Sequence, residues 1–216
     1  RSTLFPYTTL FRSPAGEWGS LRDDKDRPLM NRVVGGAYPP GSTFKVVTAA
    51  AILMEHVADV HSTVSCSGSF TLGPQTFRCW KRSGHGTESI VGALRDSCDV
   101  YFYQMSVRLG INKLLKWSKE FGVGQKTGID LPGEARGNLA GQEWKRARFK
   151  ESWYQGDTVN YSIGQGFLLM TPLQLARVYA AIANGGKLIV PRLNAGKRVE
   201  RSEEHTSELQ SPSWIS

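Results

Sequence analysis

The sequence predicts a mixed α/β fold of the α+β kind, with a helical core and a few short strands. The alanine-rich run FKVVTAAAILMEH (44–56) has apolar residues on nearly every side, which is typical of a helix buried inside a domain. Several later segments have a helix-forming composition and end at glycine. Residues 60–86 are rich in Gly, Ser, Thr and Pro, which favours loops and short strands.

In the first third of the chain, polar loops are predicted to alternate with a helix and a short strand. Residues 14–34 are polar and turn-rich, and the charged stretch RDDKDRP predicts a surface loop. The first long helix is predicted to begin at Ser42, directly after a Pro-Pro-Gly breaker. Within residues 60–86, GSFTLG is predicted to be a strand.

Four further helices are predicted after residue 86. Gly110 and Gly122 lie where the second and third of them end. Thr171 is the predicted N-cap of the fourth, and Pro172 takes its first helical position. KLIVPRL (187–193) is predicted to begin a strand. The four helical segments are SIVGALRDS, DVYFYQMSVRLG, NKLLKWSKEFG and TPLQLARVYAAIANGG (89–97, 99–110, 112–122 and 171–186).

Both ends of the chain resemble in-frame translations of sequencing-adapter DNA, one from each strand. The chain opens with RSTLFPYTTLFRS, and RSEEHTSELQS lies near its end. We therefore expect residues 1–13 and 201–216 to be adapter-derived rather than native, with ordinary disordered termini as the alternative. No run of about eighteen apolar residues occurs, so we expect no membrane span within the chain.

The chain is basic, with a net charge of +8. The two terminal segments carry equal numbers of basic and acidic residues, so the excess belongs to residues 14–200. A basic surface suits nucleic acid, an anionic membrane or an acidic polymer. The lysines and arginines are scattered in short groups, and no nucleic-acid-binding motif accompanies them, so we expect no nucleic-acid partner.

Ser42 and Lys45 form an S-x-x-K pattern at the start of the predicted buried helix. A serine hydroxyl becomes a nucleophile when a base takes its proton, and a lysine can be that base only when it is neutral, a form that burial favours. This spacing places both side chains on one helical face, where the helix dipole stabilises developing negative charge. Taken alone, the pattern more often means a capping serine followed by an ordinary lysine.

The three cysteines, together with one histidine, suggest a metal site. Cys66, Cys79, His85 and Cys98 are separated by gaps of twelve, five and twelve residues. Three thiolates and an imidazole can form a closed tetrahedral Zn²⁺ site, although these spacings are not those of a zinc finger. A Cys66–Cys79 disulfide with a free Cys98, or three simple buried thiols, are the alternatives.

Six blocks of the sequence carry a family resemblance, and they occur in the order NRVVGGAYPPGSTFK, CWKRSGHG, SCDVYFYQ, GVGQKTGIDLPGE, WYQGDTVNYSIGQG and TPLQLARVYAAIANGG. Together they resemble the class B penicillin-binding transpeptidases of the elongation type. The resemblance covers residues 14 to about 193, and it implies the transpeptidase fold shared by penicillin-binding proteins and serine β-lactamases. It also implies that residues 14–200 are a partial transpeptidase domain without its C-terminal sheet strands.

The resemblance implies a role for each active-site residue. Ser42 would be the acylated nucleophile, and Lys45 would accept its proton. The second family motif, S-x-N, matches at Ser97 to Asp99, with the aspartate that is typical of the elongation-type members. Ser97 would relay a proton to the leaving amine, while Asp99 accepts hydrogen bonds but donates none when ionised. Either residue could also cap a helix.

The third family motif, K-[ST]-G, is expected to lie beyond this chain. A matching KTG occurs at residues 126–128, but it opens the stretch GIDLPGE, whereas the family's motif follows TPLQLA on a later strand. We therefore interpret this KTG as a chance match. Without the true motif the site lacks part of its oxyanion environment, so we expect the fragment to be inactive.

The implied reaction is two-step acyl transfer that cross-links peptidoglycan. The implied partners are peptidoglycan stem peptides, β-lactam antibiotics and a membrane glycan polymerase, with the catalytic domain on the periplasmic side of the inner membrane. Some relatives hold a metal at the position of the Cys/His group, which here would tie the Ser97–Asp99 loop to residues 66–85. The rival functions are a β-lactamase, a β-lactam sensor and a non-catalytic, zinc-stabilised binding module.

Overall fold

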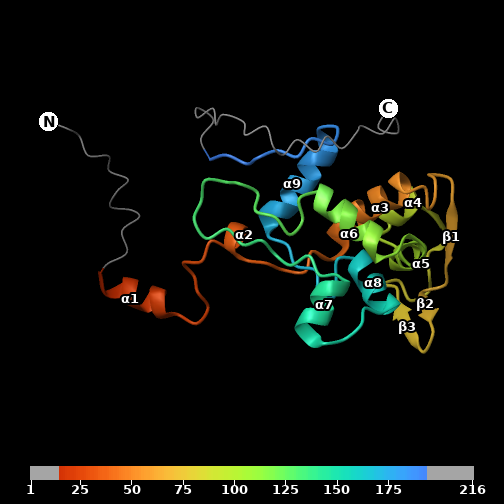
Figure 1. Cartoon of the computed structure of the whole chain (residues 1–216), viewed down its shortest axis with the longest axis horizontal. Helices are drawn as coiled ribbons and strands as arrows, with labels where there is room; N and C mark the ends of the chain where they lie inside the picture. Colours follow the sequence, from red (N-terminus) through yellow and green to blue (C-terminus); the bar gives the residue numbers. More distant parts are fainter. Residues whose placement is uncertain (1–14, 194–216) are drawn as a thin grey trace.

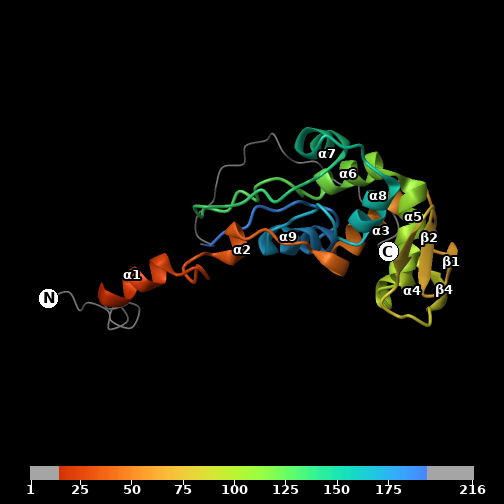
Figure 2. The ribbon, with the colours of Figure 1, turned by 90° about the horizontal axis from the view of Figure 1, so that it is seen from below.

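The structure is a computed structural model that describes residues 15–193. The short strands lie at one end of an elongated molecule, and α1 stands at the opposite end, away from the body (Figures 1 and 2). The helices of the described part are α1 (Ala15–Asp23), α2 (Arg32–Gly35), α3 (Lys45–Met54), α4 (Ile90–Arg95), α5 (Asp99–Leu109), α6 (Ile111–Glu120), α7 (Gln142–Phe149), α8 (Gln155–Ser162) and α9 (Pro172–Ala183), with a 3₁₀ turn, η2 (Gly41–Phe44), before α3.

The strands form two separate antiparallel pairs. β1 (Thr63–Cys66) pairs with β4 (Gly86–Ser89), and β2 (Ser69–Leu72) pairs with β3 (Gln75–Arg78). In the first pair Cys66 stands opposite Gly86, so its side chain lies close to the residue before β4, which is His85. Cys79 follows directly after β3. The two strand pairs thus bring Cys66, Cys79 and His85 close together.

Helix α5 lies at the centre of the core. It packs against α3, α4, α6 and α8, and against strands β1, β2 and β3. Val100, Tyr101 and Phe102 are completely buried. Because each large apolar side chain stabilises the fold by about 1.5–3 kcal/mol when fully buried, α5 is a rigid support for Asp99, its first residue.

Most predicted elements are confirmed. GSFTLG contains β2, and the four helices predicted after residue 86 are α4, α5, α6 and α9. The Thr171 hydroxyl caps α9 by accepting the Gln174 N–H at 3.1 Å, and Pro172 is the first helical residue. The first long helix is also present, but Ser42 lies in η2 and the α-helix proper begins at Lys45.

Two predictions need correction, and two helices were missed. Residues 15–34 include the helices α1 and α2, not only turns. Residues 187–193 form no strand within the described part, because a strand requires a paired neighbour and no described strand lies beside them. Helices α7 and α8 were not predicted, since their sequences, QEWKRARF and QGDTVNYS, are mostly polar and show no apolar periodicity.

Candidate active site

Ser42 is exposed and lies in η2, the tight turn that leads into α3. The N-cap positions of η2 and α3 are Pro40 and Phe44, and neither element has a side-chain cap. The capping role that the pattern alone allowed for Ser42 is therefore wrong. Its hydroxyl is left available for chemistry at the surface.

The chain segment 164–170 holds the Ser42 turn in place. Gly41 N–H donates to the Gly164 carbonyl at 2.9 Å, and Tyr38 and Met170 exchange two backbone hydrogen bonds of 2.8 Å each. Gly164 has φ +72°, and a Cβ added to it would collide with the Gly41 carbonyl. Only glycine allows these two backbones to approach so closely, so Gly164 fixes the position of the turn.

Lys45 is almost completely buried, with 1% of its surface exposed. Its Nζ donates to Asp99 Oδ1 at 2.6 Å, to the Ser97 carbonyl at 2.9 Å and to Ser97 Oγ at 3.0 Å. An ammonium group has three donors, and these three acceptors use all of them. The structure therefore places the lysine of the first pattern against both polar residues of the second.

Ser97 has a left-handed backbone, with φ 52°. This conformation costs of the order of 1–3 kcal/mol in a non-glycine residue and persists only where the surroundings hold it. Here both its carbonyl and its hydroxyl meet Lys45. The N-cap of α5 is Cys98, with no side-chain cap, so the alternative that Ser97 or Asp99 caps this helix is wrong.

The Asp99 carboxylate is held from two sides. Oδ1 accepts the hydrogen bond from Lys45, while Oδ2 accepts the backbone N–H of Trp80 at 3.0 Å. Asp99 is 8% exposed, so the ion pair lies in a largely water-free environment. Removing one partner of such a buried pair typically costs about 3–5 kcal/mol, because the other charge is left uncompensated.

The four predicted metal ligands converge at one point. The sulfur atoms of Cys66, Cys79 and Cys98 and a ring nitrogen of His85 all lie within 4.8 Å of one another. His85 Nδ1 is 3.6 Å from Cys66 Sγ and 3.5 Å from Cys79 Sγ. Tetrahedral zinc bonds of the usual length would place N and S ligand atoms about 3.6 Å apart, so the donor set and its spacing fit Zn²⁺.

The electrostatics of this Cys/His cluster are unusual for free thiols. All three cysteines are free and buried. Burial raises the pKa of the Cys66 thiol, but hydrogen bonds from His85, from the Gly68 backbone and from Cys98 together outweigh this effect and lower its pKa to about 7. Burial, together with the neighbouring Cys66, raises the pKa of Cys98 to about 12. A bound cation would stabilise three adjacent thiolates that otherwise repel one another.

The comparison with known protein families identifies the domain. Residues 11–212 match the family described as penicillin binding protein transpeptidase domain. The chain belongs to this family. The six sequence blocks therefore gave the correct family, and the domain's S-x-x-K and S-x-D patterns are the two that meet at Lys45.

Relatives of this transpeptidase domain are named peptidoglycan D,D-transpeptidase MrdA. The protein from Acinetobacter baumannii is 44% identical over 179 residues, which is 82% of this chain and 27% of the relative. The protein from Escherichia coli K12 is 36% identical over 208 residues, or 92% of this chain and 33% of the relative. The chain thus spans about a third or less of these relatives.

Solved structures agree with this assignment. Pseudomonas aeruginosa PBP2, in complex with WCK 5153, matches with a TM-score of 0.82 and 39% identity, covering 88% of this chain and 44% of that one. Helicobacter pylori PBP2, in a complex with MreC, matches with a TM-score of 0.80 and 38% identity, covering 86% and 35%. The transpeptidase fold predicted from the sequence is confirmed.

The KTG sequence of this transpeptidase domain has a structural role. The backbone N–H and hydroxyl of Thr127 donate to Glu134 Oε1, and Gly128 N–H donates to Oε2. The carbonyl of Gln125, which comes directly before the KTG sequence, accepts a hydrogen bond from the Gln174 side chain on α9. These contacts hold the 125–134 loop together and attach it to α9. They support the interpretation of this KTG as a chance match to the catalytic motif.

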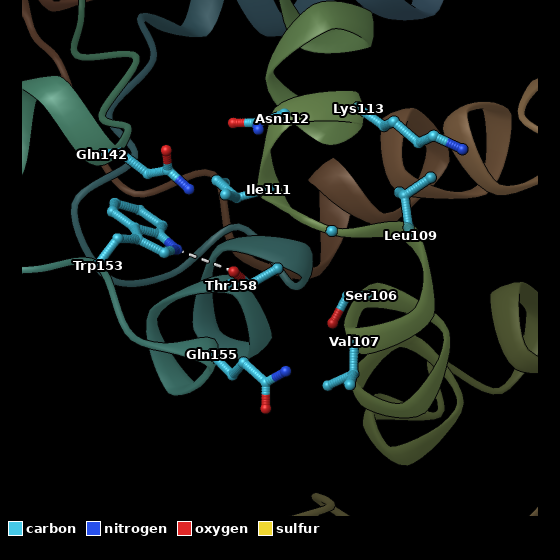
Figure 3. A pocket seen from close by; sticks show the side chains of 11 residues that line it. Ser106, Val107, Leu109, Ile111, Asn112, Lys113, Gln142, Trp153, Gln155 and Thr158 are labelled. Atoms are coloured by element: carbon cyan, nitrogen blue, oxygen red, sulfur yellow. Dashed lines mark hydrogen bonds between the residues drawn. The ribbon is translucent and has the colours of Figure 1, made fainter.

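A cavity of about 430 Å³ lies elsewhere, between the α5–α6 junction and residues 153–158 (Figure 3). Trp153 points into it and donates to Thr158 Oγ1 at 2.9 Å. None of the predicted catalytic or metal-binding residues lines it. It is therefore not part of the Ser42 site.

Two residues of the site were missed from the sequence, Trp80 and Gly164. Both lie inside quoted blocks, CWKRSGHG and WYQGDTVNYSIGQG, but no local pattern assigns them a role. Trp80 acts through a backbone N–H, which any residue except proline carries. Gly164 matters because of a close approach to a segment more than a hundred residues away.

Proposed function

We propose that this chain is the part of a peptidoglycan D,D-transpeptidase that forms the serine acyl-enzyme. The observation that carries the proposal is the buried Lys45 in contact with Ser97 and Asp99, one turn from the exposed Ser42. Relatives with 36–44% identity carry the same activity in their names. Because they are about three times as long, the activity of the whole protein is part of the proposal.

The contacts of Lys45 with Ser97 and Asp99 support a defined proton path. The Ser42 hydroxyl attacks the carbonyl of the penultimate D-Ala of a stem peptide. Lys45 acts in the form that has given up its ammonium proton, so that the neutral amine takes the hydroxyl proton. The ammonium that forms is stabilised by Asp99 Oδ1 and the Ser97 carbonyl, both already within hydrogen-bond distance. The bond to the terminal D-Ala nitrogen then breaks.

Ser97 completes the transfer. Its hydroxyl accepts a hydrogen bond from Lys45, so its own proton is free to pass to the leaving nitrogen while Lys45 replaces it. D-Ala departs as a neutral amine. An amine of a neighbouring stem peptide then attacks the Ser42 ester, which forms the cross-link and regenerates the serine.

The test uses the full-length parental protein. It would be incubated with a fluorescent penicillin and analysed by intact mass, next to a Ser42→Ala variant. We expect a stable adduct of one penicillin on the parent and none on the variant. An adduct that is rapidly hydrolysed would instead indicate a β-lactamase. No adduct on a folded parent would favour a non-catalytic, zinc-stabilised module.

A stable adduct alone does not separate a transpeptidase from a β-lactam sensor. A second measurement would follow release of D-Ala from a stem pentapeptide and its transfer to an acceptor amine. We expect release and transfer to require Ser42. Acylation by penicillin without any D-Ala release would support the sensor.

We also propose that Cys66, Cys79, His85 and Cys98 hold a structural Zn²⁺. The support is the convergence of their ligand atoms within 4.8 Å. When bound, the ion would cross-link β1, the loop after β3 and the start of α5. We expect about one zinc per protein by elemental analysis, lost in Cys79→Ser. Absence of metal together with a Cys66–Cys79 disulfide by mass spectrometry would contradict the proposal.

For partners and location, we propose stem peptides and β-lactams as ligands and a membrane glycan polymerase as partner, on the periplasmic side of the inner membrane. One similar structure is a PBP2–MreC complex, and another is a peptidoglycan synthase complex. Among residues 15–193, no helix has the length and apolar character needed to cross a bilayer. Co-purification of the full-length protein from detergent-solubilised inner membranes would test the assignment.

A further inference from the structure

Trp80 connects the Cys/His cluster to the active site through three contacts. Its backbone N–H donates to Asp99 Oδ2 at 3.0 Å, and its indole Nε1–H donates to the Asp96 carbonyl at 3.1 Å. Its ring packs edge-on against His85, with 5.4 Å between centroids. It is nevertheless 63% exposed, so apolar burial does not explain the presence of a tryptophan here.

The indole contact acts on the strained part of the site. The Asp96 carbonyl belongs to the peptide group that joins Asp96 to Ser97, and the orientation of this group is coupled to φ of Ser97. That angle is 52°, in the left-handed region. Backbone bonds also hold this turn, from Asp96 N–H to Gly92 O at 2.8 Å, from Ser97 N–H to Leu94 O at 3.4 Å and from Cys98 N–H to Ala93 O at 2.9 Å.

Ser97 needs this peptide orientation to reach Lys45. In the left-handed conformation its carbonyl and its hydroxyl lie 2.9 and 3.0 Å from Lys45 Nζ. If φ of Ser97 left this region without a compensating rotation about ψ of Asp96, the carbonyl and the hydroxyl of Ser97 would both move. Lys45 would then retain only Asp99, and the proton path to the leaving nitrogen would be interrupted.

We propose that Trp80 is a positioning residue for acylation: its indole N–H holds the Asp96–Ser97 peptide so that Ser97 stays aligned with Lys45. This inference rests on the proposed transpeptidase function. The role belongs to the indole N–H and not to the backbone N–H, which every substitution except proline retains. The ring contact with His85 sets the angle at which the indole reaches the Asp96 carbonyl.

The experiment compares three forms of the full-length protein: the parent, Trp80→Phe and Trp80→Ala. Phe keeps an aromatic ring next to His85 but removes the donor, while Ala removes both. Stopped-flow measurement with a fluorescent penicillin gives the acylation rate constant at saturation and the apparent binding constant separately. Elemental analysis and thermal melting report metal content and folding.

We expect Trp80→Phe to lower the acylation rate constant about tenfold, since small displacements of a proton-relay group have effects of this size or more. Its penicillin binding constant, zinc content and melting temperature should match those of the parent. Trp80→Ala should show a rate loss at least as large. A Trp80→Phe rate equal to that of the parent would overturn the proposal, as would a rate loss fully accounted for by lost metal or lost folded protein.

Failure of the proposed function would look different. In that case the parent itself would form no adduct, and the Trp80 comparison would start from zero. A variant in the same loop, Lys81→Ala, serves as the matched control, because Lys81 is exposed and its side chain has no hydrogen bond or ion pair with the 96–99 turn within the described part of the chain. Its acylation rate constant should equal that of the parent.

Discussion

Two buried lysines of this molecule form nearly the same ion pair but have different surroundings. Lys45 and Lys145 are 1% and 4% exposed, and each Nζ lies 2.6 Å from an aspartate oxygen, on Asp99 and Asp157 respectively. Each also lies near an aromatic ring. Burial, charge pairing and ring contact therefore do not identify a catalytic lysine.

The difference lies in the other groups at each pair. At Lys45 they are the hydroxyl and carbonyl of a strained serine, next to the exposed Ser42 turn. At Lys145 they are Glu151 at 3.7 Å and the face of the Tyr154 ring at 4.6 Å.

The carboxylate of the second pair is also committed to the fold. Asp157 Oδ2 accepts both Lys145 Nζ and the Tyr154 N–H at the start of α8. No nucleophile or proton relay is present there among the described contacts. The pair at Lys45 contacts a serine hydroxyl that the proposed mechanism uses to move a proton, whereas the pair at Lys145 joins α7 to α8.

Replacing each lysine by methionine should give the largest effects and separate a role in acylation from a role in stability. Lys45→Met removes the proposed proton acceptor, so acylation by penicillin should fall by about 10²–10⁴-fold. Lys145→Met should leave the acylation rate per folded molecule within a few-fold and mainly reduce stability, by about 3–5 kcal/mol. Stopped-flow acylation together with denaturant unfolding measures both quantities. Equal acylation losses in the two variants would invalidate the distinction.

Removal of the proposed Zn²⁺ should affect the Lys45–Asp99 pair and not the Lys145–Asp157 pair. Prolonged incubation with a strong chelator should lower the acylation rate, because Cys98 lies between Ser97 and Asp99, and it should lower the melting temperature. The Lys145 pair does not contact the cluster, so the α7–α8 junction should keep its amide-exchange protection. The acylation rate and the amide hydrogen exchange of the α7–α8 junction, measured on the same chelator-treated sample, test both expectations. Full recovery after Zn²⁺ is added back is the control.

The two aspartates should respond differently to neutralisation. Asp99→Asn keeps an acceptor for the Trp80 N–H but removes the charge that stabilises the Lys45 ammonium, so we expect about a tenfold slower acylation. Asp157→Asn should cost about 1–3 kcal/mol of stability, since it weakens a charge-assisted contact and a helix cap, with little change in the acylation rate. Stopped-flow acylation and denaturant unfolding measure the two quantities. Unchanged acylation in Asp99→Asn would show that its charge is dispensable.

The smallest effect is expected at the ion pairs of Glu55, whose side chain is partly buried next to two exposed lysines. Hydrogen bonds from Lys116 and Trp117 lower the pKa of Glu55 to about 2 from its usual 4.5. Because the folded-state pKa is depressed, this contribution to stability is present above about pH 4.5 and is lost as pH falls toward 2. Glu55→Gln should cost about 1 kcal/mol at pH 7 and progressively less below pH 4.5. Urea unfolding across this pH range measures it, and a cost that does not depend on pH would exclude the ion pair as its source.

The two lysines also show how far sequence reasoning could go. Lys45 was identified because it follows Ser42 in a recognisable pattern, and the helices with strong periodicity or clear caps were predicted with their ends nearly correct. Lys145 carries no pattern, and the two elements that it joins, α7 and α8, were missed because they depend on contacts with the rest of the fold.

By itself, the sequence determined the family, the buried helix after Ser42, the cap of α9 by Thr171 and the identity of the catalytic and metal-ligand candidates. Residue types and short spacings carry that information, since helix periodicity and capping act within a few residues. Only the tertiary structure decided that Lys45 meets Ser97 and Asp99, 52 and 54 residues away, and that Trp80 holds Asp99. Such contacts depend on how α3, α5 and the strands pack, which no local pattern records.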